Sequence, residues 1–185
     1  MRERIYVCHT YYHVYVTFLK EFALPAEERG RATVVLSKMS TDFENLKDRL
    51  EKTGVFEEVV EFDEKRFTEF DELMALHEDR GNIIKNMWAR IRFTKRYAQL
   101  EEPYVPVDFK QYREVYVYCD SDPIGYYLNY KHIPYHAIED GLNCLRLFDA
   151  ARVDNRGCFR IKALLASWNV IFIQNGYAKY CIDME

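Results

Sequence analysis

The sequence is poor in the residues that usually separate a chain into domains. Its 185 residues include 7 glycines and 5 prolines, with no internal repeat, low-complexity tract or Gly/Ser linker. Linkers are commonly rich in such residues, so their scarcity disfavours both disorder and an internal domain boundary. We expect a single domain over residues 1–185, which is enough chain to bury a hydrophobic core.

Cysteines are few and poorly spaced for cross-linking. The chain has five, with no CxxC pair: Cys8, Cys119, Cys144, Cys158 and Cys181. An odd number without that spacing argues against a disulfide framework and against a zinc ribbon. We interpret them as reduced, small apolar side chains.

Long apolar runs and an excess of basic residues are also absent. No run approaches the roughly 20 apolar residues that cross a bilayer, and the N-terminal stretch MRERIYVCHTYYH turns polar too early for a signal peptide. The net charge of -4 argues against nucleic acid as a partner. We therefore expect a cytoplasmic protein.

Four common catalytic signatures are missing: GxGxxG, GxxxxGK followed by Ser or Thr, GxSxG and HExxH. Their absence disfavours dinucleotide-dependent oxidoreduction, P-loop hydrolysis, α/β-hydrolase chemistry and zinc proteolysis.

What the chain does contain is an alternation of short apolar runs and helical patterns. Runs rich in β-branched and aromatic residues predict strands at residues 4–8, 32–37, 58–62, 114–119, 135–138 and, last, within 179–185. Helices are predicted at residues 12–23, 40–54 and 158–172, as a pair within 67–99 interrupted at 79–82, and from Pro123 onward. Such alternation favours parallel pairing through right-handed crossovers. The predicted fold is α/β, a Rossmann-like parallel sheet flanked by helices.

Polar residues follow several of the predicted strands. Ligands of an open parallel sheet bind outside the carboxyl ends of its strands, so we expect these residues at one rim. The residues at the strand ends are His9, Thr10, Tyr11 and His13 after the first strand, Ser37, Lys38, Met39 and Ser40 at the end of the second, Asp120, Ser121 and Asp122 after the fourth, and Glu139, Asp140, Gly141 and Asn143 after the fifth. Those after the first, fourth and fifth strands are the candidate site residues.

Simpler roles compete for some of these residues. His9 and His13 lie four apart, which suits metal binding, helix capping and packing, or contact with a polar substrate. Asp120, Ser121 and Asp122 are all good helix N-caps, but capping accounts for one of them and leaves two carboxylates unexplained. The adjacent carboxylates Glu139 and Asp140 repel each other and indicate either a solvated turn or a working site.

Aromatic residues make up 16% of the chain, and tyrosine-lined clefts suit sugars, although core packing is the ordinary use of such side chains. The basic aromatic segment IIKNMWARIRFTKRY, residues 83–97, is compatible with an interfacial helix or with a solvated helix face.

The stretches YVCHTYYHVYVTFLKE, EVYVYCDSDPIGYYLN and YHAIEDGLN resemble the amino-terminal half of bacterial sialyltransferase-like glycosyltransferases. These include the family 52 lipooligosaccharide sialyltransferases and the capsular polysialyltransferases. The resemblance covers most of the chain as an order of elements, and EDG is its one strict motif, matching the (D/E)(D/E)G of that group.

The resemblance implies the first half of a GT-B type enzyme, in which two Rossmann-like domains face each other and the acceptor sugar lies mainly on the first. By its place in the motif, Asp140 would be the general base on the acceptor hydroxyl, with Glu139 as the alternative, and Gly141 would allow close approach of the sugar. No metal or other cofactor is required. The donor, a nucleotide sugar such as CMP-sialic acid, would bind mainly to the second domain through an HP motif.

This chain contains no HP dipeptide. The resemblance therefore implies that the donor-binding domain lies outside these 185 residues, and we expect the chain alone to be catalytically inactive. The expected function is the acceptor side of an enzyme that moves a sugar, with sialic acid as a candidate, from a nucleotide donor to a cell-surface glycan.

Two other functions share the predicted scaffold: a polyol-phosphate or other polymer-forming transferase, and a non-catalytic binding or assembly module. Contact with the inner face of the membrane and a homodimer formed through an exposed last strand are further expectations.

Overall fold

The computed structural model describes residues 1–138, 159–171 and 176–185. It divides into two compact units, Met1–Glu64 with Tyr104–Tyr118, and Lys65–Pro103 with Cys119–Glu185.

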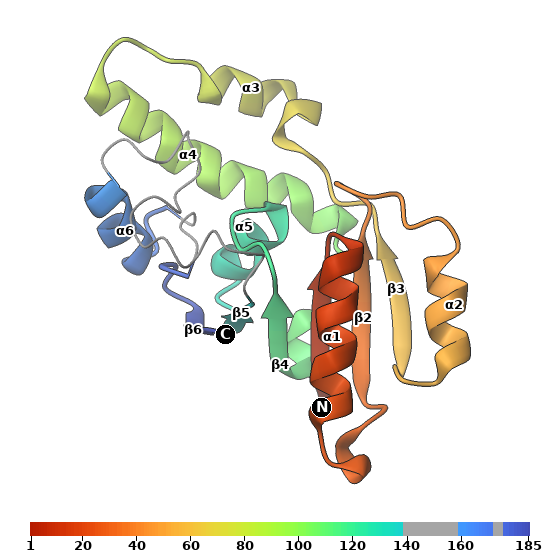
Figure 1. Cartoon of the computed structure of the whole chain (residues 1–185). Coiled ribbons are helices and arrows are strands. Elements are labelled where there is room, and N and C mark those ends of the chain that lie inside the picture. The colour runs from red at the N-terminus through yellow and green to blue at the C-terminus, as the bar shows by residue number, and fades with distance from the viewer. Residues whose placement is uncertain (139–158, 172–175) are drawn as a thin grey trace. The chain divides into compact units, whose positions relative to one another are not determined.

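The first unit is built on a parallel sheet. Its strands are β1 (Arg2–Cys8), β2 (Ala32–Ser37), β3 (Glu58–Phe62) and β4 (Tyr112–Val117), in the order β3-β2-β1-β4 (Figure 1). Each neighbouring pair is parallel, and Tyr6 of β1 lies opposite Val34 and Tyr116. Strands of a parallel sheet are covered on both faces, which accounts for apolar runs such as ATVVLS, all of it buried.

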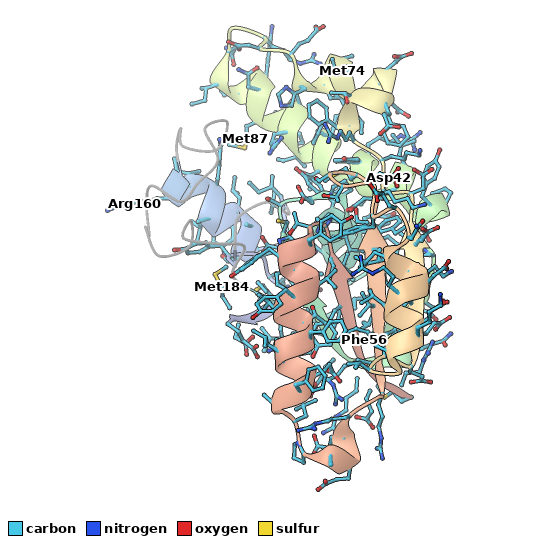
Figure 2. The ribbon with its side chains drawn as sticks, turned by 45° about the vertical axis from the view of Figure 1, so that its right-hand side comes forward. Asp42, Phe56, Met74, Met87, Arg160 and Met184 are labelled. Atoms are coloured by element: carbon cyan, nitrogen blue, oxygen red, sulfur yellow. The ribbon has the colours of Figure 1, made fainter. Side chains whose placement is uncertain are left out.

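Helices α1 (Tyr11–Ala23) and α2 (Leu46–Thr53) connect the first three strands. Both crossovers step in the same direction across the sheet, so right-handed connections place both helices on one face, in front of the strands in Figure 2. Phe56, labelled there, packs edge-to-face on Phe18 of α1 with ring centroids 4.9 Å apart. Short 3-10 helices at Ala26–Glu28 and Phe109–Gln111 complete this unit.

The prediction of a helix from Ser40 was wrong, because α2 begins at Leu46 with Asn45 as its N-cap. Phe43 is 1% exposed, and Glu44 has a φ of 46°, in the left-handed region that an L-residue helix cannot pass through. Burial of Phe43 therefore delays the helix. Gly54, with a φ of 64°, ends it as predicted.

The described residues of the second unit form four α-helices and a strand pair. These are α3 (Asp71–His77), α4 (Ile83–Glu101), α5 (Pro123–Tyr130), α6 (Phe159–Ser167), β5 (Tyr135–Ala137) and β6 (Cys181–Met184), and the two strands pair in parallel. Two 3-10 helices lie at Phe67–Glu69 and Glu102–Tyr104. Its core joins Leu73 of α3, Phe93, Tyr97 and Ala98 of α4 and Tyr126 of α5.

Two predicted helix boundaries in this unit are confirmed. Helix α3 ends at His77 and α4 begins at Ile83. Between them, the Asn82 side chain caps α4 by accepting hydrogen bonds from the N–H groups of Ile84 and Lys85 at 2.9 and 3.2 Å. Pro123 occupies the first turn of α5.

The predicted fold class is confirmed: the chain is α/β, with parallel strands flanked by helices in a Rossmann-like arrangement. The single-domain expectation stays a prediction. Among the described residues, every helix is too short or too polar to cross a bilayer.

Candidate functional site at the carboxyl ends of the strands

The loop after β1 turns the chain directly into α1. Thr10 is the N-cap, and its hydroxyl accepts a hydrogen bond from the N–H of His13 at 3.3 Å. His9 and His13 are buried, at 2% and 1% exposed, whereas Tyr11 is 50% exposed and its ring contacts Phe43 edge-on. Of the four residues predicted here, two are therefore buried imidazoles, one caps the helix, and one is half in solvent.

A buried carboxylate joins the ends of three strands. Glu64, which follows β3 and is 3% exposed, places Oε2 at 2.7 Å from Nε2 of His9, just after β1. The same oxygen accepts a hydrogen bond from the Ser37 hydroxyl, at the end of β2, at 2.5 Å. Burial of a carboxylate is costly unless hydrogen bonds compensate for the lost hydration, and these two partners supply them. We call Glu64, His9 and Ser37 the Glu64 cluster.

His13 extends this arrangement along α1. The N–H of His9 donates to Nδ1 of His13 at 3.0 Å, which makes that nitrogen an acceptor and leaves any ring proton on Nε2. The His13 ring lies flat against Tyr118, with centroids 4.2 Å apart and planes 3° from parallel. The Tyr118 hydroxyl is in turn 2.8 Å from Oγ1 of Thr17. Ring stacking and hydrogen bonds thus hold both imidazoles in one orientation.

Cys8 lies next to this network but is not a reactive thiol. Its Sγ is 3.5 Å from Oγ1 of Thr17. Burial raises the pKa of Cys8 to about 12, against a smaller opposing effect of that hydrogen bond. The thiol therefore stays protonated at neutral pH, and the nucleophilic thiolate is not formed.

In the second unit, Asp120 links residues that are far apart in the sequence, Tyr135 and Gly176. It is 3% exposed, and its Oδ2 accepts hydrogen bonds from the Tyr135 hydroxyl at 3.1 Å and from the N–H of Gly176 at 2.9 Å. Burial raises the pKa of Tyr135 well above its ordinary value, and the negative charge of Asp120 adds to the effect, so Tyr135 remains a hydrogen-bond donor. Asp120 thus has a defined structural role.

Asp122 and Ser121 lie directly before helix α5, where the sequence predicted that one of them could act as the N-cap. Asp122 is the N-cap residue of α5 by its extended backbone, but its side chain accepts no capping hydrogen bond, and it is 6% exposed. Ser121 is half-buried in the turn before it. Capping therefore does not account for the Asp122 carboxylate.

The predicted catalytic pair and its neighbours, Glu139, Asp140, Gly141 and Asn143, lie outside the described residues. Their roles, and the shared cleft expected for them with His9 and Asp120, stay predictions.

One group in the second unit has ligand atoms close enough for a metal ion. His136, Asp183 and Glu185 place one such atom each within 4.8 Å of one another. Nδ1 of His136 is already 2.7 Å from Oδ1 of Asp183, and both acids are exposed, so an ordinary surface ion pair accounts for the geometry.

The first unit also has a pocket of about 630 Å³ lined by α1, β1 and β4. Tyr6 and Tyr116 stack in its wall with centroids 4.8 Å apart, and the ammonium of Lys20 lies 4.9 Å from the Tyr116 ring centre. None of the residues predicted to bind substrate lines this pocket.

Ser37 was predicted to lie at this rim, but the sequence analysis missed Glu64. The signal was available, because Glu64 follows the third predicted strand within EFDEK. Applying the strand-end rule to that strand as well would have included it.

Comparisons with protein-family models, with curated proteins and with solved structures find no match for this chain.

Proposed function

We propose that this chain is the acceptor side of a glycosyltransferase that transfers a sugar from a nucleotide donor to a glycan, with sialic acid as the first donor sugar to test. The observation that carries the proposal is the Glu64 cluster, three buried polar side chains gathered where parallel strands end. In α/β proteins this edge is where ligands bind. The resemblance to sialyltransferase-like enzymes adds the EDG motif of residues 139–141.

The chemistry of the cluster suits a sugar acceptor. Sugar hydroxyls donate and accept hydrogen bonds at once, so a subsite for them needs acceptors and donors held in fixed positions. The Glu64 carboxylate is buried and is bonded to the Ser37 hydroxyl and the His9 ring, so it fixes these polar groups where the strands end and does not itself contact the sugar. Such preorganisation lowers the cost of fixing the acceptor before reaction.

In the proposed reaction, the oxygen of the acceptor hydroxyl attacks the anomeric carbon of the donor sugar. The bond between that carbon and the phosphate oxygen of the nucleotide breaks, and the nucleotide leaves with the electron pair. The carboxylate of Asp140 takes the hydroxyl proton as general base, with Glu139 as the alternative. No metal takes part in this scheme, and the donor binds mainly to residues outside this chain.

A donor screen tests the reaction class. The complete gene product is incubated with cytidine and uridine sugar nucleotides and a panel of oligosaccharide acceptors, and products are identified by mass spectrometry. Transfer from a cytidine monophosphate sugar supports the proposal. Transfer of a polyol phosphate from a cytidine diphosphate carrier would instead identify a polymer-forming transferase, and glycan binding without any turnover would identify a binding module.

Acceptor binding tests the cluster itself. Glu64→Gln keeps the shape of the side chain but weakens the hydrogen bonds that hold His9 and Ser37 in place. We expect the Kd for acceptor oligosaccharides to rise about tenfold or more, because hydrogen bonds to charged groups contribute about 1.5–3 kcal/mol. Saturation-transfer NMR and calorimetry measure the change. Glu61→Gln is the matched control, since Glu61 lies three residues earlier, in β3, and pairs at the surface with Lys38. Equal affinities for the two variants would remove the cluster from the acceptor site.

A further inference from the structure

Helix α4 presents two faces of different character. Its buried face carries Ala89, Phe93 and Tyr97 at intervals of four residues, packed against α3 and α5 (Figure 1). Exposed apolar side chains gather on the first turns of the helix: Ile83 is 69%, Ile84 67% and Trp88 64% exposed. Large apolar side chains grouped in this way commonly mark an interaction surface.

Basic side chains continue the exposed face toward the C-terminal half of the helix. Lys85, Arg92 and Lys95 are exposed and form no hydrogen bond or ion pair through their side chains with the described residues. Ile84, Trp88, Arg92 and Lys95 follow one another at intervals of three or four, so they share one face.

Within the part of the chain that the structure describes, no acidic side chain pairs with Lys85, Arg92 or Lys95. The one acidic residue of α4, Glu101, is buried and accepts a hydrogen bond from the N–H of Lys65 at 3.0 Å. On α3, Glu72 pairs with Arg96, at 2.7 Å from its Nε, and leaves Lys85, Arg92 and Lys95 uncompensated. The helix is thus a basic segment in a chain whose net charge is -4.

We propose that the face formed by Ile84, Trp88, Arg92 and Lys95, with Ile83 and Lys85 beside it in the first turn of the helix, binds the surface of a membrane that contains anionic lipids. A helix that lies in the plane of a membrane inserts apolar and tryptophan side chains at the level of the headgroups and directs Lys and Arg to the lipid phosphates. The two kinds of side chain on α4 match that pattern.

The combination of basic and apolar side chains distinguishes a lipid surface from other acidic partners. A nucleic acid or an acidic peptide would engage the three cations but would leave Ile83, Ile84 and Trp88 in water. A lipid surface satisfies both sets at once, since its phosphates meet the cations and its acyl boundary receives the apolar side chains. The inference does not depend on the proposed sugar transfer, because vesicle binding is measured without donor or acceptor.

Tryptophan fluorescence tests the contact directly. The chain has 2 tryptophans, so Trp168→Phe leaves Trp88 as the single reporter. We expect its emission to shift to shorter wavelength with vesicles of phosphatidylcholine and phosphatidylglycerol, to be quenched by brominated lipid, and to stay unchanged with phosphatidylcholine alone.

Variants separate the charge from the apolar contact. Lys85→Gln, Arg92→Gln and Lys95→Gln together should weaken vesicle binding about 100-fold, which corresponds to about 1 kcal/mol per basic residue near an anionic surface. The control replaces Lys47, Arg49 and Lys52 of α2 by Gln, the same change of net charge on the other unit, and should bind as the wild type does. Ile84→Ser with Trp88→Ser should also release the protein, whereas Leu19→Ser, at an equally apolar site on α1 that is 51% exposed, should not.

Four results would overturn the inference. The first is absence of binding to anionic vesicles at low salt. The second is bound protein whose Trp88 emission is not shifted, and the third is equal loss of binding in the α2 control. Capture of the protein by polyglutamate or heparin with no vesicle binding would also overturn it, because it would show a general acidic partner in place of a lipid surface.

Discussion

Gly125 shows how closely a single residue is constrained in this chain. A Cβ at this position would lie 1.9 Å from the backbone oxygen of Asp120, well inside van der Waals contact. The first turns of α5 can therefore pack on the loop after β4 only with glycine here, and Asp120 in turn holds Tyr135 and Gly176.

Gly125→Ala should lower the free energy of unfolding by at least about 1–3 kcal/mol, the usual cost of overpacking a tight site. Urea unfolding followed by circular dichroism measures it. Gly30→Ala is the control, because Gly30 has a φ of 74° but nothing within 4 Å of the added Cβ, so backbone strain is its sole penalty, about 1 kcal/mol. A loss for Gly125→Ala no larger than that of the control would contradict the packing argument.

The raised pKa of Cys8 predicts that the stability of the fold decreases at alkaline pH. Its pKa is about 12 in the fold against an ordinary value of 9.0, so the unfolded thiol ionises first as the pH rises. The contribution to stability is full below about pH 9 and is lost between about pH 9 and 12, with about 1.4 kcal/mol gone by about pH 10. Urea unfolding of wild type and Cys8→Ala at several pH values measures it. The variant should lose less between neutral pH and about pH 10, and parallel losses would refute this role of the thiol.

The sequence was sufficient to identify the residues at strand ends but not what they do there. His9 and His13 were candidates with three competing roles, and the contacts of Glu64 and Tyr118 with their rings now define their surroundings. Those contacts join positions far apart in the chain, which no local pattern reveals. Asp120 was expected to bind substrate, and its hydrogen bonds to Tyr135 and Gly176 add a structural role that the sequence did not indicate.

At the scale of elements, a buried ion pair between Arg4 and Glu21 joins β1 to α1. Nε and Nη2 of Arg4 donate to the two carboxylate oxygens of Glu21 at 2.9 and 3.2 Å, and the Tyr6 hydroxyl donates to the same carboxylate at 2.9 Å. Glu21 is fully buried, so its charge depends on these partners.

Glu21→Gln should therefore lower the free energy of unfolding by about 3–5 kcal/mol, the usual cost of leaving a buried charge without its partner. Glu72→Gln is the control, because it breaks an exposed pair with Arg96 between α3 and α4 and should change stability little. Thermal and urea unfolding compare the two. Similar losses for both variants would mean that the Arg4–Glu21 pair contributes no more than a surface one.

Elements with strong apolar patterns were predictable, and those decided by tertiary contacts were not. β2 and β3 begin and end where the sequence patterns at residues 32–37 and 58–62 place them. β2 is buried throughout and needs an apolar run, whereas the edge strand β3 buries Val59 and Phe62 and exposes Glu58 and Glu61. The start of α2 depends on the burial of Phe43, a contact with the rest of the unit that overrides the N-cap preference of Ser40.

For the molecule as a whole, the sequence predicted the fold class through the alternation of strands and helices, and the structure confirms it. The proposed function depends on two separate parts of the chain: the Glu64 cluster in the first unit, and the EDG motif, which lies outside the described residues. In this proposal the first supplies a place for the acceptor, and the second supplies the base.

The most direct test of this account is sugar transfer by the complete gene product with Asp140→Asn, in the donor and acceptor pair found by the screen. We predict that kcat falls by about 10²–10⁴-fold, the usual contribution of a general base, while acceptor affinity and thermal unfolding stay at their wild-type values. Glu139→Gln, the neighbouring carboxylate, separates the two candidate bases, because a larger loss of rate in this variant than in Asp140→Asn would assign the base to Glu139. An Asp140→Asn enzyme that transfers sugar at the wild-type rate would contradict the central claim.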